Sequence, residues 1–143
     1  MPYIHVSVSR LPDRNLAQAL AQGVTERTFK ILRKRLELTA VSVSFVDPEH
    51  WFVGGQSLQA LERTAFWLDI GVTAGTNSKD EKATYLAEIF AFMRETLGAL
   101  HEISYVRVLD VPADAWGYGG VSQEERYVRG KLERPPDVHA SVR

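Results

Sequence analysis

Pro2 is the first candidate for chemistry, because removal of Met1 would turn its ring nitrogen into a free secondary amine. An α-amino group has an ordinary pKa of about 7.7–8.0, and burial in an apolar pocket lowers that pKa because it disfavours the cation. An amine whose pKa lies near the working pH can take an acidic C–H proton and return it to another atom. The alternative is purely structural, since proline suits the first position of a strand. The sequence therefore predicts Pro2 as a general acid or base, provided that Met1 is removed.

Arg107 is the second candidate, because it lies in the middle of an expected strand on a face that is otherwise apolar. An unpaired guanidinium there would be costly. Such an arginine suits bidentate capture of a carboxylate and would stabilise an enolate beside it. An equally weighted alternative is an ion pair between subunits, with a carboxylate such as Asp69, Asp110 or Glu102.

Three further side chains are candidates for contacts with a substrate: Tyr118, Asn77 and Trp116. Tyr118 lies in a Gly-Tyr-Gly-Gly turn, where its hydroxyl could hydrogen-bond a carbonyl or its ring could simply pack. The Asn77 amide could hold part of a carboxylate, although asparagine before a helix is also ordinary turn chemistry. Trp116, like Trp51, is a packing anchor in one interpretation and a pocket wall in the other. The four histidines lack the spacing of metal ligands, so no metal site is expected.

The elements that would position these residues form an internal repeat. Trp51 and Trp116 lie 65 residues apart, and each opens a Trp-x-x-Gly-Gly sequence. Each copy is predicted to run strand, helix, strand and then this turn. The first βαβ unit covers 2–55 and the second covers 66–120, followed by a polar C-terminal tail at 121–143. We expect residues 1–143 to form a single domain, with the last ten or so residues mobile or acting as an arm on a neighbour.

Hydrophobic periodicity defines the expected elements. Alternation predicts strands at 3–9, 40–47, 66–72 and 103–111, and a helical period predicts one helix after each unit's first strand. The first helix is capped by Asp13 and runs to about Leu36, and the second begins at the capping box of Ser78 and Glu81 and stops at Gly98. The residues expected to face the core from the second helix are Leu86, Ile89, Phe90, Met93 and Leu97.

These elements predict an α/β (α+β) fold, a tandem βαβ repeat that forms a four-stranded sheet with two helices on one face. The other face of the sheet would still carry apolar residues, which need a second cover. With no further helix expected to provide that cover, the sequence predicts an oligomer.

Composition limits the classes of function. The 143 residues include 17 basic and 18 acidic side chains, and this balance argues against a nucleic-acid partner. No apolar run approaches the roughly 20 residues that cross a bilayer, so no membrane partner is expected. The chain has no cysteine, which excludes a disulfide framework, a thiol nucleophile and a thiolate metal site. No secretion signal is recognisable, and a cytoplasmic location is the expectation.

Pro2, the βαβ repeat and the Trp-x-x-Gly-Gly endings together resemble the tautomerase superfamily, whose namesake is 4-oxalocrotonate tautomerase. Its small members are single βαβ units, and this chain looks like a fused, double-length member from Pro2 to about Gly120. The resemblance implies a β-α-β fold, a homotrimer of fused chains and an N-terminal proline that acts as general acid or base. It also implies a small carboxylic-acid substrate and no cofactor.

Several positions depart from the double-length dehalogenases of that superfamily. Those enzymes carry a pair of arginines after the third strand, where this chain has Ala74 and Asn77, and a histidine on the first helix, where it has Thr28. Their water-activating tyrosine and glutamate correspond to Arg107 and Tyr118. These differences argue against 3-haloacrylate dehalogenation.

The sequence therefore favours a cofactor-independent keto–enol tautomerase, an isomerase that moves a proton on a small 2-oxo or enol carboxylic acid. Pro2 would transfer the proton and Arg107 would hold the carboxylate or enolate, while Tyr118, Asn77 and Trp116 would contact the substrate. Two alternatives stay open: hydratase or decarboxylase chemistry on a three-carbon acid, and a non-catalytic trimeric homologue. The second unit starts at Phe66 and offers no free amine, so we expect one site per chain.

Overall fold

The computed structural model describes residues 2–133 of the chain. Contacts between residues divide the chain into two compact units, with the boundary between Asp110 and Val111. The first unit holds the sheet and the two long helices, and the second holds a short hairpin and a helix. Each unit is considered by itself below, and the grouping of all 143 residues into one domain stays a prediction.

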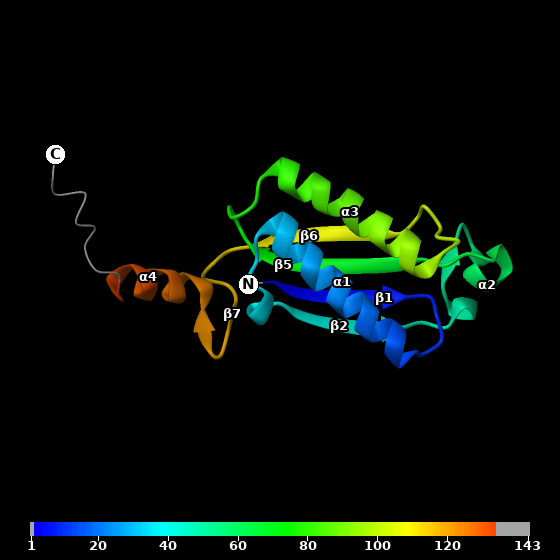
Figure 1. Cartoon of the computed structure of the whole chain (residues 1–143), viewed down its shortest axis with the longest axis horizontal. Helices are drawn as coiled ribbons and strands as arrows, with labels where there is room; N and C mark the ends of the chain where they lie inside the picture. Colours follow the sequence, from blue (N-terminus) through cyan, green and yellow to red (C-terminus); the bar gives the residue numbers. More distant parts are fainter. Residues whose placement is uncertain (1, 134–143) are drawn as a thin grey trace. The chain divides into compact units, whose positions relative to one another are not determined.

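A mixed four-stranded sheet with the order β2-β1-β5-β6 forms the centre of the first unit (Figure 1). Strand β1 (Tyr3–Val8) pairs parallel with β2 (Ala40–Phe45) and antiparallel with β5 (Phe66–Thr73), and β6 (Tyr105–Val111) lies beside β5. The four predicted strands are therefore present. Three are shorter than predicted, since β1 ends at Val8, β2 ends at Phe45 and β6 begins at Tyr105.

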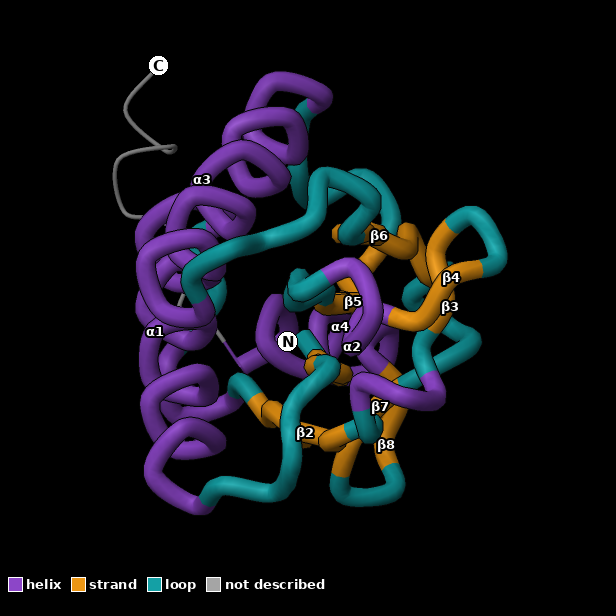
Figure 2. Tube along the Cα trace, turned by 90° about the vertical axis from the view of Figure 1, so that its right-hand side faces the viewer, coloured by secondary structure: helices purple, strands orange, loops and turns teal. Residues whose placement is uncertain are grey.

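Helices α1 (Arg14–Leu32) and α3 (Lys79–Leu97) pack together on one face of the sheet (Figure 2). Their predicted starts are confirmed: the Asp13 side chain accepts a hydrogen bond from the Leu16 amide, and Ser78 and Glu81 form the reciprocal capping box. Gly98 caps the end of α3, also as predicted.

The first helix ends earlier than predicted. Instead of continuing to about Leu36, it stops at Leu32, because Arg33 adopts a left-handed backbone conformation with φ of 58°. The Lys34 amide then donates to the Thr28 carbonyl, which closes the last turn. A short 3₁₀ turn at Leu36–Leu38 follows, so Lys34 lies in the loop beyond the helix.

The hydrophobic core lies between the sheet and these two helices. Strand residues that alternate toward the helices are completely buried, and so are the facing residues of both helices. They are Ile4, Val6, Val8, Leu20, Val24, Phe66, Leu68, Ile70, Val72, Tyr85, Ile89 and Met93. The prediction that Leu86 faces the core is wrong: it is 41% exposed, and Tyr85 takes the inward position. Tyr85, Ile89, Met93 and Leu97 follow one another at four-residue steps, which keeps them on one helix face.

The two helices touch closely at two points. A Cβ built on Gly23 of α1 would lie 2.0 Å from the Phe92 ring of α3, so a larger residue fits there only if the ring or the helices move. Further along, the Tyr85 hydroxyl lies 2.9 Å from the Thr28 hydroxyl, which itself donates to the Val24 carbonyl. Thr28, the residue at the position of the dehalogenase histidine, is therefore a buried contact between helices.

Each Trp-x-x-Gly-Gly sequence forms a two-residue hairpin. The hairpins are β3 (Phe52–Val53) with β4 (Gln56–Ser57), and β7 (Gly117–Tyr118) with β8 (Val121–Ser122). Both glycines of each pair have positive φ, between 58° and 79°, which only glycine adopts readily in such a turn. The repeated motif is thus a repeated structure.

The repeat continues beyond the glycines, into residues 56–64 between the two predicted units and into the polar tail that begins at 121. Helix α2 (Leu58–Leu61) follows the first hairpin and α4 (Gln123–Glu133) follows the second. The first amide of each helix donates to the carbonyl of the preceding tryptophan, at 2.8 Å and 2.9 Å. Sequence patterns did not predict α4, because its polar composition hid the helix.

Two further predictions concern the chain ends and membranes. The expectation that the last ten or so residues are mobile or an arm falls on 134–143, which lie outside the described residues. Within residues 2–133, no helix is long and apolar enough to cross a membrane.

A second 3₁₀ turn lies at Pro48–His50 in the first unit.

Candidate functional site

Pro2 directly precedes β1 and is buried. Its carbonyl accepts a hydrogen bond from the Ala40 amide at 3.3 Å, so the parallel pairing of β1 with β2 extends to this residue. Because side chains alternate along a strand, Pro2 shares the helix-covered face with Ile4. The candidate amine therefore lies at the end of the sheet where β1 and β2 begin and β5 ends.

Two loops meet at this same end of the sheet. The segment after α1 contributes Lys34, whose ammonium donates to the Thr76 hydroxyl at 2.9 Å. The loop between β5 and α3 also contributes Asn77, whose side-chain nitrogen donates to the Leu32 carbonyl at 3.0 Å. Thr76 is itself fixed, because its hydroxyl donates to the Thr73 carbonyl at 2.6 Å. These bonds hold one cation and one amide in defined positions at the Pro2 end.

Lys34 is a candidate residue that sequence reasoning missed. It is only 8% exposed, and burial, helped by the nearby Arg33 charge, lowers its pKa below 10.5 even though Glu81 and Asp110 oppose the shift. The basic run from Lys30 to Arg35 is typical of a helix C-terminus, where cations favour the helix dipole. The left-handed stop at Arg33, which places Lys34 beyond the helix, has no sequence signal because the residue is not glycine.

Asn77 lies at the expected end of the sheet, but its amide is oriented differently from the expectation. The nitrogen that could have held a carboxylate is bound to the Leu32 carbonyl. The side-chain oxygen is buried and has no hydrogen-bond partner among the described residues. The Asn77 nitrogen is therefore already partnered, and contact of Asn77 with a substrate stays a prediction.

Arg107 forms a bidentate ion pair with Asp69, with Nε–Oδ1 of 2.8 Å and Nη2–Oδ2 of 3.2 Å. The expected ion pair thus forms within one chain, on neighbouring strands, and not between subunits. Its neighbours Val106 and Val108 pack against the core, so Arg107 points to the helix-free face. Pro2 and Arg107 of one chain consequently lie on opposite faces of the sheet.

The ion pair changes the titration of both groups. Burial alone would raise the pKa of Asp69, but hydrogen bonds from Arg107 and Trp67 and the Arg107 charge outweigh burial and hold that pKa below 3.8. The Asp69 hydrogen bond and charge raise the pKa of Arg107. The guanidinium also lies 5.8 Å from the centre of the Trp67 ring. Arg107 is therefore charged and already partnered.

Trp116 and Tyr118 belong to the second unit. The Trp116 carbonyl accepts from the Gln123 amide, and the Tyr118 carbonyl accepts from the Arg126 side chain at 2.7 Å. The Arg126 guanidinium also lies 3.6 Å from the centre of the Tyr118 ring. These contacts hold the hairpin to α4, and contact of either side chain with a substrate stays a prediction.

The start of the second βαβ unit has no free amine, and its nitrogen is hydrogen-bonded within the chain. The Phe66 nitrogen is a peptide amide that donates to the Ser104 hydroxyl at 3.2 Å. The guanidinium of Arg10 donates to the Leu97 carbonyl at the end of α3, as Asn77 donates to the Leu32 carbonyl at the end of α1. This supports the expectation that the second unit has no proline-type site.

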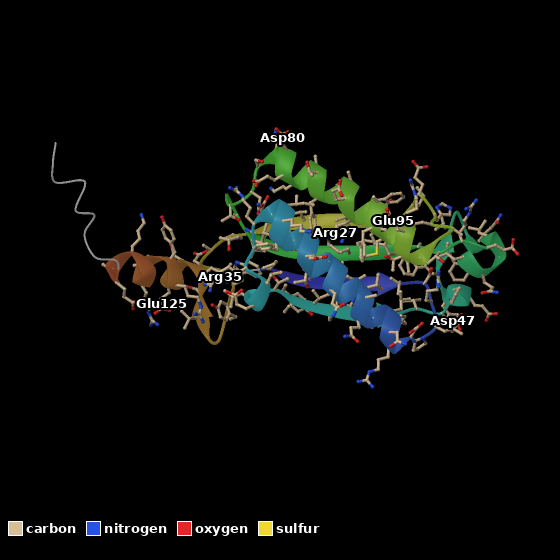
Figure 3. All side chains as sticks on the ribbon, in the orientation of Figure 1. Arg27, Arg35, Asp47, Asp80, Glu95 and Glu125 are labelled. Carbon is tan, nitrogen blue, oxygen red and sulfur yellow. The ribbon has the colours of Figure 1, made fainter. Side chains whose placement is uncertain are left out.

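A groove of about 710 Å³ lies away from Pro2, at the other end of β1. It is lined by residues of the loop after β1 and of the loop after β2, among them Arg10, Asp13 and Asp47. Figure 3 shows Asp47 far from Arg35, which follows Lys34 at the Pro2 end. Among residues 2–133, no group of three or more His, Asp or Glu side chains is placed to hold a metal ion.

No family model and no curated protein sequence matches this chain. Solved structures match over most of its length. Pt0534 inactivated by 2-oxo-3-pentynoate has a TM-score of 0.74 and 17% identity, covering 92% of this chain and 99% of its own. A symmetric trimer of wild-type fused 4-OT has a TM-score of 0.75 and 14% identity, covering 87% and 98%.

A third structure, FG41 malonate semialdehyde decarboxylase inhibited by 3-bromopropiolate, has a TM-score of 0.69 and 17% identity, covering 93% of this chain and 99% of its own. Sequence identities this low establish a shared fold only. The resemblance predicted from Pro2, the repeat and the Trp-x-x-Gly-Gly endings is therefore confirmed for the fold. The chain has the fold of the tautomerase superfamily, in the double-length form of fused 4-OT.

Proposed function

We propose that this chain is a cofactor-independent tautomerase that moves a proton on a small 2-oxo or enol carboxylic acid. The mature Pro2 amine is the general acid or base. The observation that carries the proposal is the position of Pro2, a buried residue directly before β1 in a fold shared with fused 4-OT. Burial keeps an amine from being strongly basic, which suits proton transfer near neutral pH.

The proton transfer balances without a cofactor. The amine takes a proton from the carbon next to the carbonyl, and the electron pair of the broken C–H bond moves onto the carbonyl oxygen to give an enolate. The resulting ammonium returns the proton to another carbon. The Lys34 charge, held by Thr76 at the same end of the sheet, would hold the substrate carboxylate and favour the enolate.

The roles proposed for the remaining predicted residues depend on the assembly of several chains. The fused 4-OT structures are described as trimers, and we extend a homotrimer to this chain. Arg107 faces away from the Pro2 of its own chain. In the trimer, Arg107 would therefore hold the substrate carboxylate at the Pro2 site of a neighbouring chain. Contacts of Trp116 and Tyr118 with the substrate, and a cytoplasmic location, belong to the same proposal.

Pro2→Ala tests the proposal, with Pro12→Ala as the matched control. Pro12 lies in the loop before α1, at the opposite end of β1. After intact mass has verified that Met1 is absent, ketonisation of a small enol carboxylic acid is measured for each protein. We expect Pro2→Ala to lose much of the roughly 10²–10⁴-fold contribution of acid–base catalysis, and Pro12→Ala to keep the wild-type rate. An unchanged rate in Pro2→Ala contradicts the proposal.

A decarboxylase or hydratase acting on a three-carbon acid is the second candidate function. The observation that favours it is the similarity to malonate semialdehyde decarboxylase over 93% of this chain. The same protein is therefore assayed with malonate semialdehyde and with an acetylenic acid. A higher kcat/KM on either than on the enol acid would reverse the order of the two candidates. Activity on none of them would favour a non-catalytic homologue.

A further inference from the structure

A small pocket of about 210 Å³ lies at the end of the sheet away from Pro2, where β1 ends and β5 begins. Its lining includes Ser9 and Thr64, whose side chains are buried, since the two residues are only 1% and 7% exposed. Each hydroxyl accepts a hydrogen bond, Ser9 from the Ala65 amide at 2.8 Å and Thr64 from Nε of Arg10 at 3.3 Å. Neither hydroxyl hydrogen has an acceptor among the described residues. Buried donors of this kind call for an acceptor from outside the chain.

Two guanidinium groups bring positive charge to the same pocket. Arg10 is fixed in its wall, because Nε donates to Thr64 and Nη2 donates to the Leu97 carbonyl. Its other terminal nitrogen, Nη1, has no partner among residues 2–133. Arg63 also lines the pocket, and its exposed side chain forms no ion pair or hydrogen bond within the described part of the chain. These two cations outweigh the single carboxylate of the lining, that of Glu62, so the pocket suits the carboxylate group of a ligand.

Negative charge dominates the groove of about 710 Å³ that adjoins this pocket. The two cavities share three lining residues: Arg10, Pro48 and Gln59. The groove adds three carboxylates, those of Asp13, Asp47 and Glu49. One oxygen of Asp13 accepts from the Leu16 amide and one of Asp47 accepts from the Glu49 amide, so each keeps a second oxygen for a ligand. A charged group that binds in the groove is therefore a cation.

We infer that the pocket and the groove together bind a small zwitterion, a molecule with a carboxylate and an ammonium group, as in an amino acid. The ligand carboxylate accepts the free hydrogens of Ser9 and Thr64 and pairs with the guanidinium of Arg63. The ligand ammonium lies among the carboxylates of the groove. This site is at the other end of β1 from Pro2, so it is separate from the proposed proton transfer and does not depend on it.

The opposed charges select against ligands with one kind of charge. A simple carboxylic acid would satisfy the pocket but leave the groove carboxylates without a cation. A simple amine would leave the buried hydroxyl hydrogens of Ser9 and Thr64 without an acceptor, which is costly. Inorganic phosphate would bring more negative charge toward the three groove carboxylates, which would repel it.

Glycine, 4-aminobutyrate and 6-aminohexanoate test the inference, because they place the two charges at increasing separations. Each is compared with the unsubstituted acid and the unsubstituted amine of the same number of carbons, and binding to the full chain is followed by NMR titration. We expect at least one of the zwitterions to bind roughly tenfold more tightly than its acid and its amine. The perturbed amides should belong to the segments around Ser9, Asp47 and Thr64.

Two variants at exposed positions divide the site into its halves. Arg63→Met should weaken the binding of the zwitterion and of its acid, and leave the amine unchanged. Glu49→Gln should reduce the advantage of the zwitterion over its acid. Arg14→Met is the matched control, because Arg14 is exposed near the groove but belongs to neither lining, and it should change nothing.

Equal binding of every zwitterion and its acid would overturn the inference, since the site would then recognise an anion alone. No binding of any zwitterion would overturn it too, because water would then satisfy the buried hydroxyls. An equal effect of Arg63→Met and Arg14→Met would also contradict it. Pro2→Ala should bind the zwitterion as the wild type does, so the failure of this inference and the failure of the proposed function are observed separately.

Discussion

Asp69 and Arg107 face each other on the neighbouring strands β5 and β6 and are joined by two hydrogen bonds of 2.8 Å and 3.2 Å on the helix-free face of the sheet. The first repeat has a counterpart on its own strands, where His5 of β1 lies 2.8 Å from the Ser42 hydroxyl of β2. His5 and Asp69 are direct partners in the pairing of β1 with β5. Polar cross-strand pairs therefore occupy the middle of the face that a neighbouring chain would cover.

Asp69→Asn should destabilise the protein in a pH-dependent way. The native pKa of Asp69 lies below 3.8, so its ion pair contributes stability that is present above about pH 4 and is lost as the pH falls through the native pKa. Thermal unfolding between about pH 2 and 7 should show the largest difference in Tm at the neutral end. Asp114→Asn, at an exposed position of the second unit, serves as control. A difference in Tm that stays constant over this range would contradict the assignment.

Gly23→Ala should disrupt the contact between α1 and α3. The added Cβ would lie 2.0 Å from the Phe92 ring, so the ring or the helices must move, at a cost of about 1–3 kcal/mol of unfolding free energy. Gly130→Ala in α4 is the matched control, because a Cβ there meets nothing within 4 Å and alanine favours a helix. Denaturant unfolding of both variants measures the difference. Equal effects of the two substitutions would show that the close approach at Gly23 is unimportant.

Tyr85→Phe should protect the protein at alkaline pH. Burial raises the pKa of Tyr85 to about 12, although the hydrogen bond with Thr28 opposes this, whereas the unfolded side chain titrates near 10.0. The native state therefore holds the proton longer, and the wild type loses stability as the pH rises from about 10 to 12. Near neutral pH the variant lacks the hydrogen bond with Thr28, which lowers its unfolding free energy by about 1 kcal/mol. Unfolding curves that respond identically to alkaline pH in both proteins would rule out this explanation.

Lys34→Met should lower the activity of the protein and raise its stability. Burial of the ammonium is unfavourable in the folded state, so its removal should raise Tm at neutral pH while it lowers kcat/KM for an enol acid. Because the native pKa of Lys34 is lowered, the stability gain should shrink as the pH rises through that value toward 10.5. Lys30→Met, at an exposed position near the end of α1, is the control. A variant that keeps wild-type kcat/KM would remove Lys34 from the proposed site.

The sequence predicted those parts of the fold whose signals are local. Alternating apolar residues identified the strands, and the side chains of Asp13, Ser78 and Glu81 identified the helix starts, because a cap is made by residues three positions apart. Spacing alone did not distinguish Tyr85 from Leu86 as the inward residue. That choice depends on the rotation of α3 over the sheet.

The candidate site was predicted less completely, because its geometry depends on contacts between distant segments. Pro2 followed from its position in the chain. Lys34 did not, since its burial depends on a left-handed stop at a residue other than glycine and on a loop that is distant in sequence. The orientation of the Asn77 amide was also hidden, because its partner Leu32 belongs to another element.

The most direct measurement of the central claim compares the chain with and without Met1. Both forms are prepared, verified by intact mass and assayed for ketonisation of the same enol acid under the same conditions. We predict that the Met1-free protein is active, and that the form with Met1 loses the roughly 10²–10⁴-fold contribution of acid–base catalysis, because its Pro2 nitrogen is then a tertiary amide. Equal rates for the two forms would contradict the claim that the Pro2 amine carries the chemistry.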